Sequence, residues 1–157
     1  MNCFLFGLFC FASSVSAAEV VAPTMPIATY ESEDDFATVK ENVVNAIINH
    51  GLTISNTLHI SEMLNRTGKD LGFPNPVYIS AESIEFCSAS ISHKMTQLSP
   101  LNLTICPFTI AIYNQPNKPD QVHVAFRKPH LVGKTPEKLE QEIETLLEKI
   151  VQEALDF

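Results

Sequence analysis

The stretch that decides the fold runs from Phe108 to Arg127 and reads FTIAIYNQPNKPDQVHVAFR. On both sides of a loop rich in Pro and Asn, apolar residues alternate with small or polar ones, which is typical of two antiparallel strands joined in a hairpin. We expect the first strand to run from Leu101 to Tyr113, with an interruption at Pro107. The second strand is expected over residues 121–127, after a loop over residues 114–120.

The pairing of these two strands sorts their side chains onto two faces. A shift of the pairing by two residues would change the partners and preserve the faces. If Tyr113 lies opposite Gln121, one face is wholly apolar, with Phe108 opposite Phe126, Ile110 opposite Val124 and Ile112 opposite Val122.

The other face of the hairpin carries small, polar and cationic side chains. His123 and Arg127 share this face because positions along a strand alternate, and Thr109 and Tyr113 lie beside them. Such a group could hold a small anion or carboxylate. Alternatively, Arg127 pairs with a carboxylate across a dimer interface. We take these four residues as candidates for contact with a small ligand or a protein partner.

Two long amphipathic helices bracket the strands. Ser32 with Asp35 three residues later resembles a capping box and Gly51 is typical of a helix end, which together predict a helix over residues 33–50. The second helix is expected to be capped by Thr135 and to continue to the end of the chain. Its apolar residues form one stripe, and its opposite face is strongly acidic and best explained as solvated.

Alternating residues over 52–60, with Leu58 among the inward positions, predict a half-buried strand. Predominantly antiparallel strands between two long helices indicate an α+β fold with both helices on one face of the sheet. We expect a single domain over residues 30–157, preceded by an extended lead-in over residues 19–29.

Two short helices are expected in the connections. One covers residues 61–71, with Met63 and Leu64 facing inward, before a Gly- and Pro-rich break. The other covers residues 90–98. Residues 77–87 are compatible with either a strand or a helix.

The N-terminus has the pattern of a signal peptide. Residues 3–12 form an apolar stretch of the length of a signal-peptide core, and small residues suited to cleavage follow. We therefore expect a signal peptide over residues 1–18 and a periplasmic or secreted mature protein. No later apolar run is long enough for an integral membrane span. The net charge of −8 argues against binding to nucleic acid.

Removal of the signal peptide would leave Cys87 and Cys106 as the two cysteines of the mature chain. An even pair in an oxidising compartment favours a disulfide, which would stabilise the fold by about 3 kcal/mol in the chain-entropy model. The alternatives are two separately buried thiols or a reactive or metal-binding pair.

A metal hypothesis adds two residues to the cysteines. Cys87, His93, Met95 and Cys106 provide sulfur and imidazole ligands of the kind that suits copper or haem iron. On a helix, however, His93 and Met95 point in nearly opposite directions. A protein without a cofactor is therefore preferred.

An ordered set of short motifs supports a family resemblance. Phe86-Cys87-Ser88-Ala89, then Pro100, then Cys106-Pro107-Phe108 with Ile110, Ala111 and Tyr113, and finally Arg127-Lys128-Pro129 together resemble the domain of unknown function 302 family, in its exported, cysteine-bearing branch. The resemblance implies a strongly curved antiparallel sheet with two helices and a tendency toward homodimers. It implies no reaction.

These observations favour a non-enzymatic, exported binding or assembly module of a bacterial envelope that uses the helix-free sheet face. The alternative is a thiol-based metal or redox site around Cys87 and Cys106. An enzyme with dispersed residues ranks third, because the sequence lacks a glycine-rich phosphate loop, a Gly-x-Ser-x-Gly elbow and a zinc-binding His-Glu-x-x-His helix.

Export predicts a mature protein that begins at Ala18 or Glu19. Intact-mass measurement on material from the secreted or periplasmic fraction checks this expectation. A soluble species that retains Met1 in that fraction would contradict it.

Overall fold

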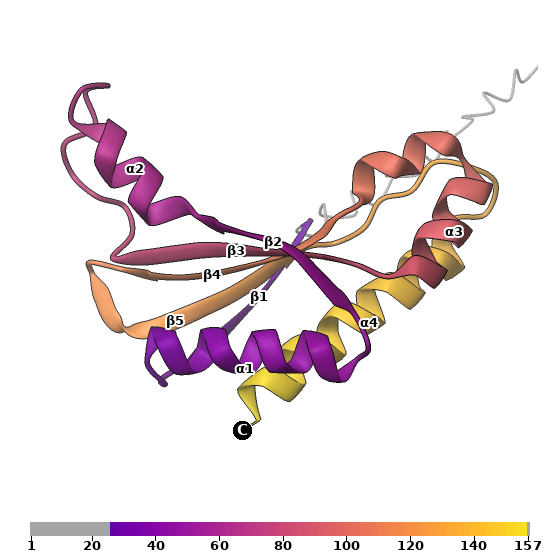
Figure 1. Ribbon diagram of the computed structural model, residues 1–157, viewed down its shortest axis with the longest axis horizontal. Coiled ribbons are helices and arrows are strands. Elements are labelled where there is room, and N and C mark those ends of the chain that lie inside the picture. Colours follow the sequence, from indigo (N-terminus) through magenta and orange to yellow (C-terminus); the bar gives the residue numbers. More distant parts are fainter. Residues whose placement is uncertain (1–25, 157) are drawn as a thin grey trace, which may run out of the picture.

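A computed structural model describes residues 26–156, which form an open, five-stranded antiparallel sheet with helices around it (Figure 1). The predicted α+β fold is confirmed. The predicted signal peptide and most of the lead-in lie outside the described residues. The strand order is β1-β5-β4-β3-β2. The elements are β1 (Ile27–Ser32), α1 (Phe36–Asn49), β2 (Thr53–His59), α2 (Ile60–Gly68), β3 (Ser80–Cys87), α3 (Ala89–Leu98), the 3-10 helix η1 (Pro100–Ile105), β4 (Phe108–Gln115), β5 (Lys118–Arg127) and α4 (Glu137–Leu155).

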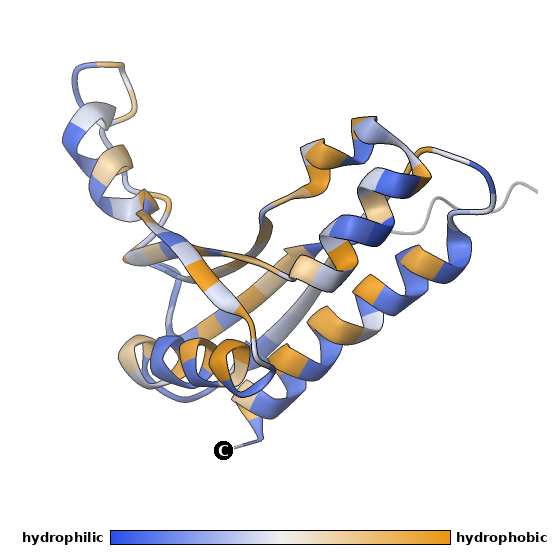
Figure 2. Cartoon of the chain, turned by 45° about the vertical axis from the view of Figure 1, so that its right-hand side comes forward, coloured by the Kyte–Doolittle hydropathy of each residue, from blue (hydrophilic) through white to orange (hydrophobic). Residues whose placement is uncertain are grey.

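The two long helices cover the same face of the sheet, as predicted (Figure 1). Val43 and Ile47 from α1 and Ile143 and Ile150 from α4 are all 0% exposed and belong to one core with Ile110 of β4. Figure 2 shows apolar and polar residues in separate stripes along α4. Each buried aliphatic side chain of this kind stabilises the fold by roughly 1.5–3 kcal/mol.

Asp35 alone caps α1. Its carboxylate accepts hydrogen bonds from the backbone N–H groups of Ala37 and Thr38 and from the Thr38 hydroxyl, which lowers the pKa of Asp35. The helix therefore begins at Phe36, three residues later than predicted. Gly51 has a φ of 72° just beyond the helix end, a conformation that glycine adopts without steric cost.

The central hairpin has the predicted faces with a different register. Tyr113 lies opposite His123, two positions from the predicted partner Gln121. The pairing shifts between Asn114 and Gln115, so the strands continue to a tight turn, and the predicted loop was too long. Asn114 fixes this irregularity, because its side chain accepts from Ser80 N and donates to the Pro119 carbonyl. Inward residues such as Val124 are nonetheless fully buried.

The predicted parity of the strand over residues 52–60 is wrong beyond its middle. The pairing of β2 with β3 shifts between Ile54 and Asn56, which leaves Ser55 as the extra residue of a β-bulge. A single extra residue reverses the face of everything that follows it. Leu58 is therefore 41% exposed and lies away from the helices.

Three further expectations are corrected. Met63 and Leu64 are exposed, and α2 has no buried residue. Residues 101–105 form η1 rather than a strand. The hydroxyl of Thr135 donates to the carbonyl of Lys134 and does not cap α4. None of the helices described between residues 26 and 156 is long and apolar enough to cross a membrane.

A pair of substitutions tests the two faces of the hairpin. Val124→Asp places a charge in the core beneath the helices and is expected to lower the free energy of unfolding by at least about 3 kcal/mol. Thr109→Asp, on the exposed opposite face, is the matched control and should change it by less than about 1 kcal/mol. Chemical denaturation measures both. Equal destabilisation would contradict the assignment of faces.

Candidate functional site

The face of the sheet away from α1 and α4, called the open face below, has mostly small side chains at its centre. Its central row crosses all five strands and consists of Thr29, Ala125, Ala111, Ser83 and Leu58. Small side chains let another molecule approach the sheet closely. The four residues predicted on the hairpin stand beside this row: Thr109 and Arg127 are exposed, Tyr113 is half-buried and His123 is buried.

Three rings form a cluster along one side of the open face. Tyr113 lies parallel to the imidazole of His123, with ring centroids 4.9 Å apart, and Tyr78 meets Tyr113 edge-on at 5.3 Å. Burial, followed by the nearby Tyr78 and Glu31, raises the pKa of Tyr113. The tyrosine therefore stays neutral and able to donate a hydrogen bond over the physiological range.

Both ring nitrogens of His123 lack a hydrogen-bond partner among residues 26–156. The side chain lies across from Glu31 on β1, and its Nδ1 is 3.5 Å from a Glu31 carboxylate oxygen, which is long for a hydrogen bond. Among the described residues, neither ring nitrogen has a hydrogen-bond partner, although His123 is only 8% exposed. Glu31 is instead held by the side-chain amide of Gln121 at 2.6 Å. Sequence reasoning missed Glu31, which makes this cluster mixed rather than purely cationic.

The two predicted cysteines lie together at the other end of the sheet. Their sulfur atoms are 2.9 Å apart, and the Ser92 hydroxyl of α3 lies 3.7 Å from the sulfur of Cys106. Both side chains are half-buried. Burial, followed by the hydrogen bond with Cys106, raises the pKa of Cys87 to about 11.

The other two residues of the metal hypothesis lie in different environments. Met95 is 0% exposed and packs in the core, whereas His93 is exposed on α3. Residues 26–156 contain no cluster of three or more His, Cys, Asp or Glu side chains arranged to hold a metal ion. What the structure offers here is a dithiol.

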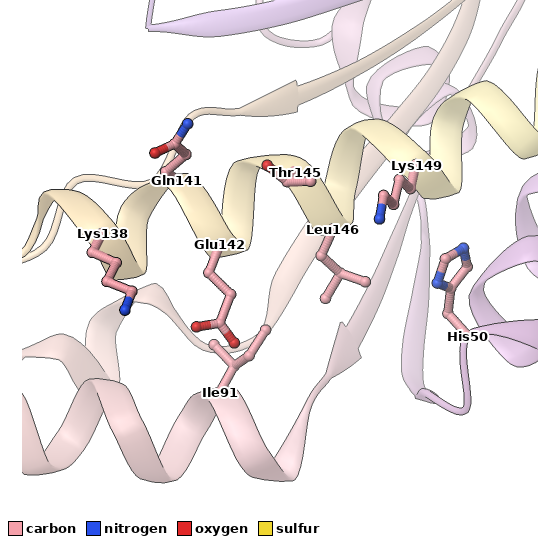
Figure 3. Close-up of a pocket in the computed structure, with 8 residues that line it drawn as sticks. All are labelled: His50, Ile91, Lys138, Gln141, Glu142, Thr145, Leu146 and Lys149. Carbon is pink, nitrogen blue, oxygen red and sulfur yellow. The ribbon is translucent and has the colours of Figure 1, made fainter.

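A shallow groove of about 490 Å³ lies between α3, α4 and the end of α1 (Figure 3). Lys138 and Lys149 of α4 and His50 form part of its lining, and Ile91 and Leu146 supply apolar surface. His50 is paired with Glu153 at 3.1 Å, outside the groove lining. The lining mixes charges of both signs, since Glu142 also contributes, and it shows that the polar side of α4 is not wholly acidic.

The fold and the two candidate sites define a class: an α+β domain with a one-sided helical layer, an open sheet face and a dithiol at one end of the sheet. The chain belongs to the family described as domain of unknown function DUF302, which matches residues 28–154. This match confirms the family that the short motifs predicted.

A solved structure supports the fold. The crystal structure of an uncharacterized conserved DUF302 protein from Bacillus stearothermophilus superposes with a TM-score of 0.63 at 17% sequence identity, covering 85% of this chain and 98% of that one. At this identity the likeness establishes the fold alone. No curated protein matches the sequence.

The raised pKa of Cys87 has a measurable consequence in the reduced protein. Only the thiolate reacts with iodoacetamide, so alkylation of Cys87 should reach its half-maximal rate near pH 11 rather than near the ordinary thiol value of 9.0. Peptide mass spectrometry after timed alkylation at a series of pH values gives the profile. An inflection at or below pH 9 would contradict the burial argument.

Proposed function

We propose that the chain is an exported, non-enzymatic assembly module of a bacterial envelope, and that its open face binds a protein partner, namely a second copy of the same chain. The N-terminal apolar stretch with its small-residue cleavage region supports export. The observation that carries the assembly proposal is the concentration of exposed large apolar side chains at the two ends of the open face.

Residues 58–79, called the arm below, hold most of these side chains. The arm consists of the end of β2, α2 and the loop to β3, and it extends from the sheet on the side away from α1 (Figure 1). Seven of the twelve exposed large apolar side chains among the described residues belong to it: Leu58, Met63, Leu64, Leu71, Phe73, Val77 and Ile79. Exposed large apolar side chains concentrated in one segment favour an interaction site there.

The loop of the arm is built to present Phe73. The backbone N–H of Phe73 donates to the carbonyl of Gly68 at 2.7 Å, so the chain folds back tightly after α2. A Cβ atom at residue 68 would lie 2.7 Å from the Phe73 carbonyl oxygen, which is why glycine is needed there. Phe73 is 73% exposed at the end of this fixed loop. Exposed, rigidly held aromatic residues are common anchors of protein interfaces.

A second apolar patch, called the η1 patch below, lies at the opposite end of the sheet (Figure 1). It consists of Leu101 and Leu103 of η1 and the neighbouring Val132, all more than half exposed. Two open faces related by a two-fold axis would bring the arm of each protomer to the η1 patch of the other. Together the arm and the patch offer ten large side chains, on the order of 800 Å² per protomer, which is about one side of a standard interface.

Charge does not oppose a second copy at the arm. The whole chain has a net charge of −8, so two copies repel one another over most of their surface. The arm is an exception, because Glu62 and Asp70 are balanced by Arg66 and Lys69. The unsatisfied His123 and the exposed Arg127 would supply polar contacts within the interface.

Self-association predicts a dimer with a dissociation constant at or below about 10 µM. Phe73→Glu removes the anchor and adds a charge, and we expect it to weaken the dimer at least about tenfold. Light scattering coupled to size-exclusion chromatography at a series of concentrations measures the change.

Asn75→Glu is the matched control, since it adds the same charge to the same loop and removes no apolar surface. It should weaken the dimer much less. A wild-type protein that stays monomeric throughout, or equal effects of the two substitutions, would contradict the proposal.

A further inference from the structure

We propose that Cys87 and Cys106 are the site of an intrachain disulfide that closes α3 and η1 into a covalent ring at the end of the sheet. The geometry of the two sulfur atoms and their surroundings favours this bond, whether or not the chain self-associates through its open face.

The ends of two paired strands bring the cysteines together. Phe86 of β3 lies opposite Phe108 of β4, so the chain leaves and re-enters the sheet at neighbouring points. Cys87 is the last residue of β3, and Cys106 directly follows η1, two residues before β4 begins. The sheet therefore holds both residues in place before any bond forms, and the sulfur atoms are 2.9 Å apart.

The proposed step is a thiol–disulfide exchange. The two thiols lose two protons and two electrons and form one S–S bond, while the disulfide of an oxidising protein or of oxidised glutathione accepts them and becomes two thiols. A compartment that contains such oxidants is the one that the N-terminal sequence predicts.

The surroundings of the pair suit a permanent disulfide better than a catalytic thiol. Reactive cysteines lie beside cations that stabilise the thiolate, whereas the charged neighbour that acts on Cys87 is the carboxylate of Glu85. A thiol that is poorly ionised is also a poor leaving group, so a bond to it is broken slowly by other thiols. The same property makes it a weak metal ligand, since metals bind the thiolate.

The bond would add to hydrogen bonds that already hold η1 in place. Asn102 of η1 is 0% exposed, and its side chain donates to the carbonyls of Met95 and Val132 and accepts from Val132 N. These contacts fasten η1 to α3 and to the segment that leads to α4. At the far end of η1, Cys106 would add a covalent link to β3.

The experiment compares the oxidised and reduced forms of the mature protein as isolated from the periplasmic fraction. The oxidised form should be 2 Da lighter, with no titratable thiol at residues 87 and 106 after denaturation without reductant, and a peptide map should show them joined. On reduction, amide hydrogen exchange in residues 88–105 should accelerate at least about tenfold.

A variant with both Cys87→Ser and Cys106→Ser should show the amide hydrogen exchange rates of the reduced protein. Added reductant should leave these rates unchanged. Folded protein that keeps two free thiols after incubation with oxidised glutathione would overturn the proposal. Bound copper or zinc that blocks both thiols, or cysteines joined between two chains, would overturn it as well.

Discussion

The rest of this structure depends on the alternation of side chains along β4 and β5. These neighbouring strands lie inside the sheet, and their inward residues, among them Ile110 and Val124, are 0% exposed beneath the helices. The apolar stripes of α1 and α4 pack in one core with these inward residues, so burial on one face of the hairpin fixes where both helices lie. The same alternation leaves the opposite face without a helical cover.

Local sequence patterns were sufficient to predict two parts of the fold. Period-2 alternation predicted the faces of the hairpin, and helical periodicity predicted α1 and α4. The register could not be predicted, because it depends on bonds from Asn114 to Ser80 and Pro119, and Ser80 is 34 residues away in sequence. The bulge at Ser55 likewise follows from the pairing with β3, and it moved Leu58 to the other face.

The candidate sites also contain residues that local patterns predicted and residues that only long-range pairing brings together. His123 and Tyr113 were predicted to share a face because both lie on the hairpin. Glu31 was not predicted to join them, since β1 pairs with β5 only through a contact between segments about ninety residues apart. Helical geometry explains why Met95 entered the core and His93 did not, as two positions on a helix differ by about 200°.

Within the described residues, the core and the arm differ in how much they stabilise the fold. Core residues such as Phe86 lose all their exposure, whereas α2 buries none of its residues, although ordering each residue costs about 1–2 kcal/mol of backbone entropy. Hydrogen bonds within the arm, such as that from the Thr67 hydroxyl to the Met63 carbonyl, offset only part of this cost. Within residues 26–156, α2 lies against β3, and the large apolar side chains of the arm stay exposed. Self-association as proposed above would bury this apolar surface, and a core that contains no residue of the arm leaves the arm free for that role.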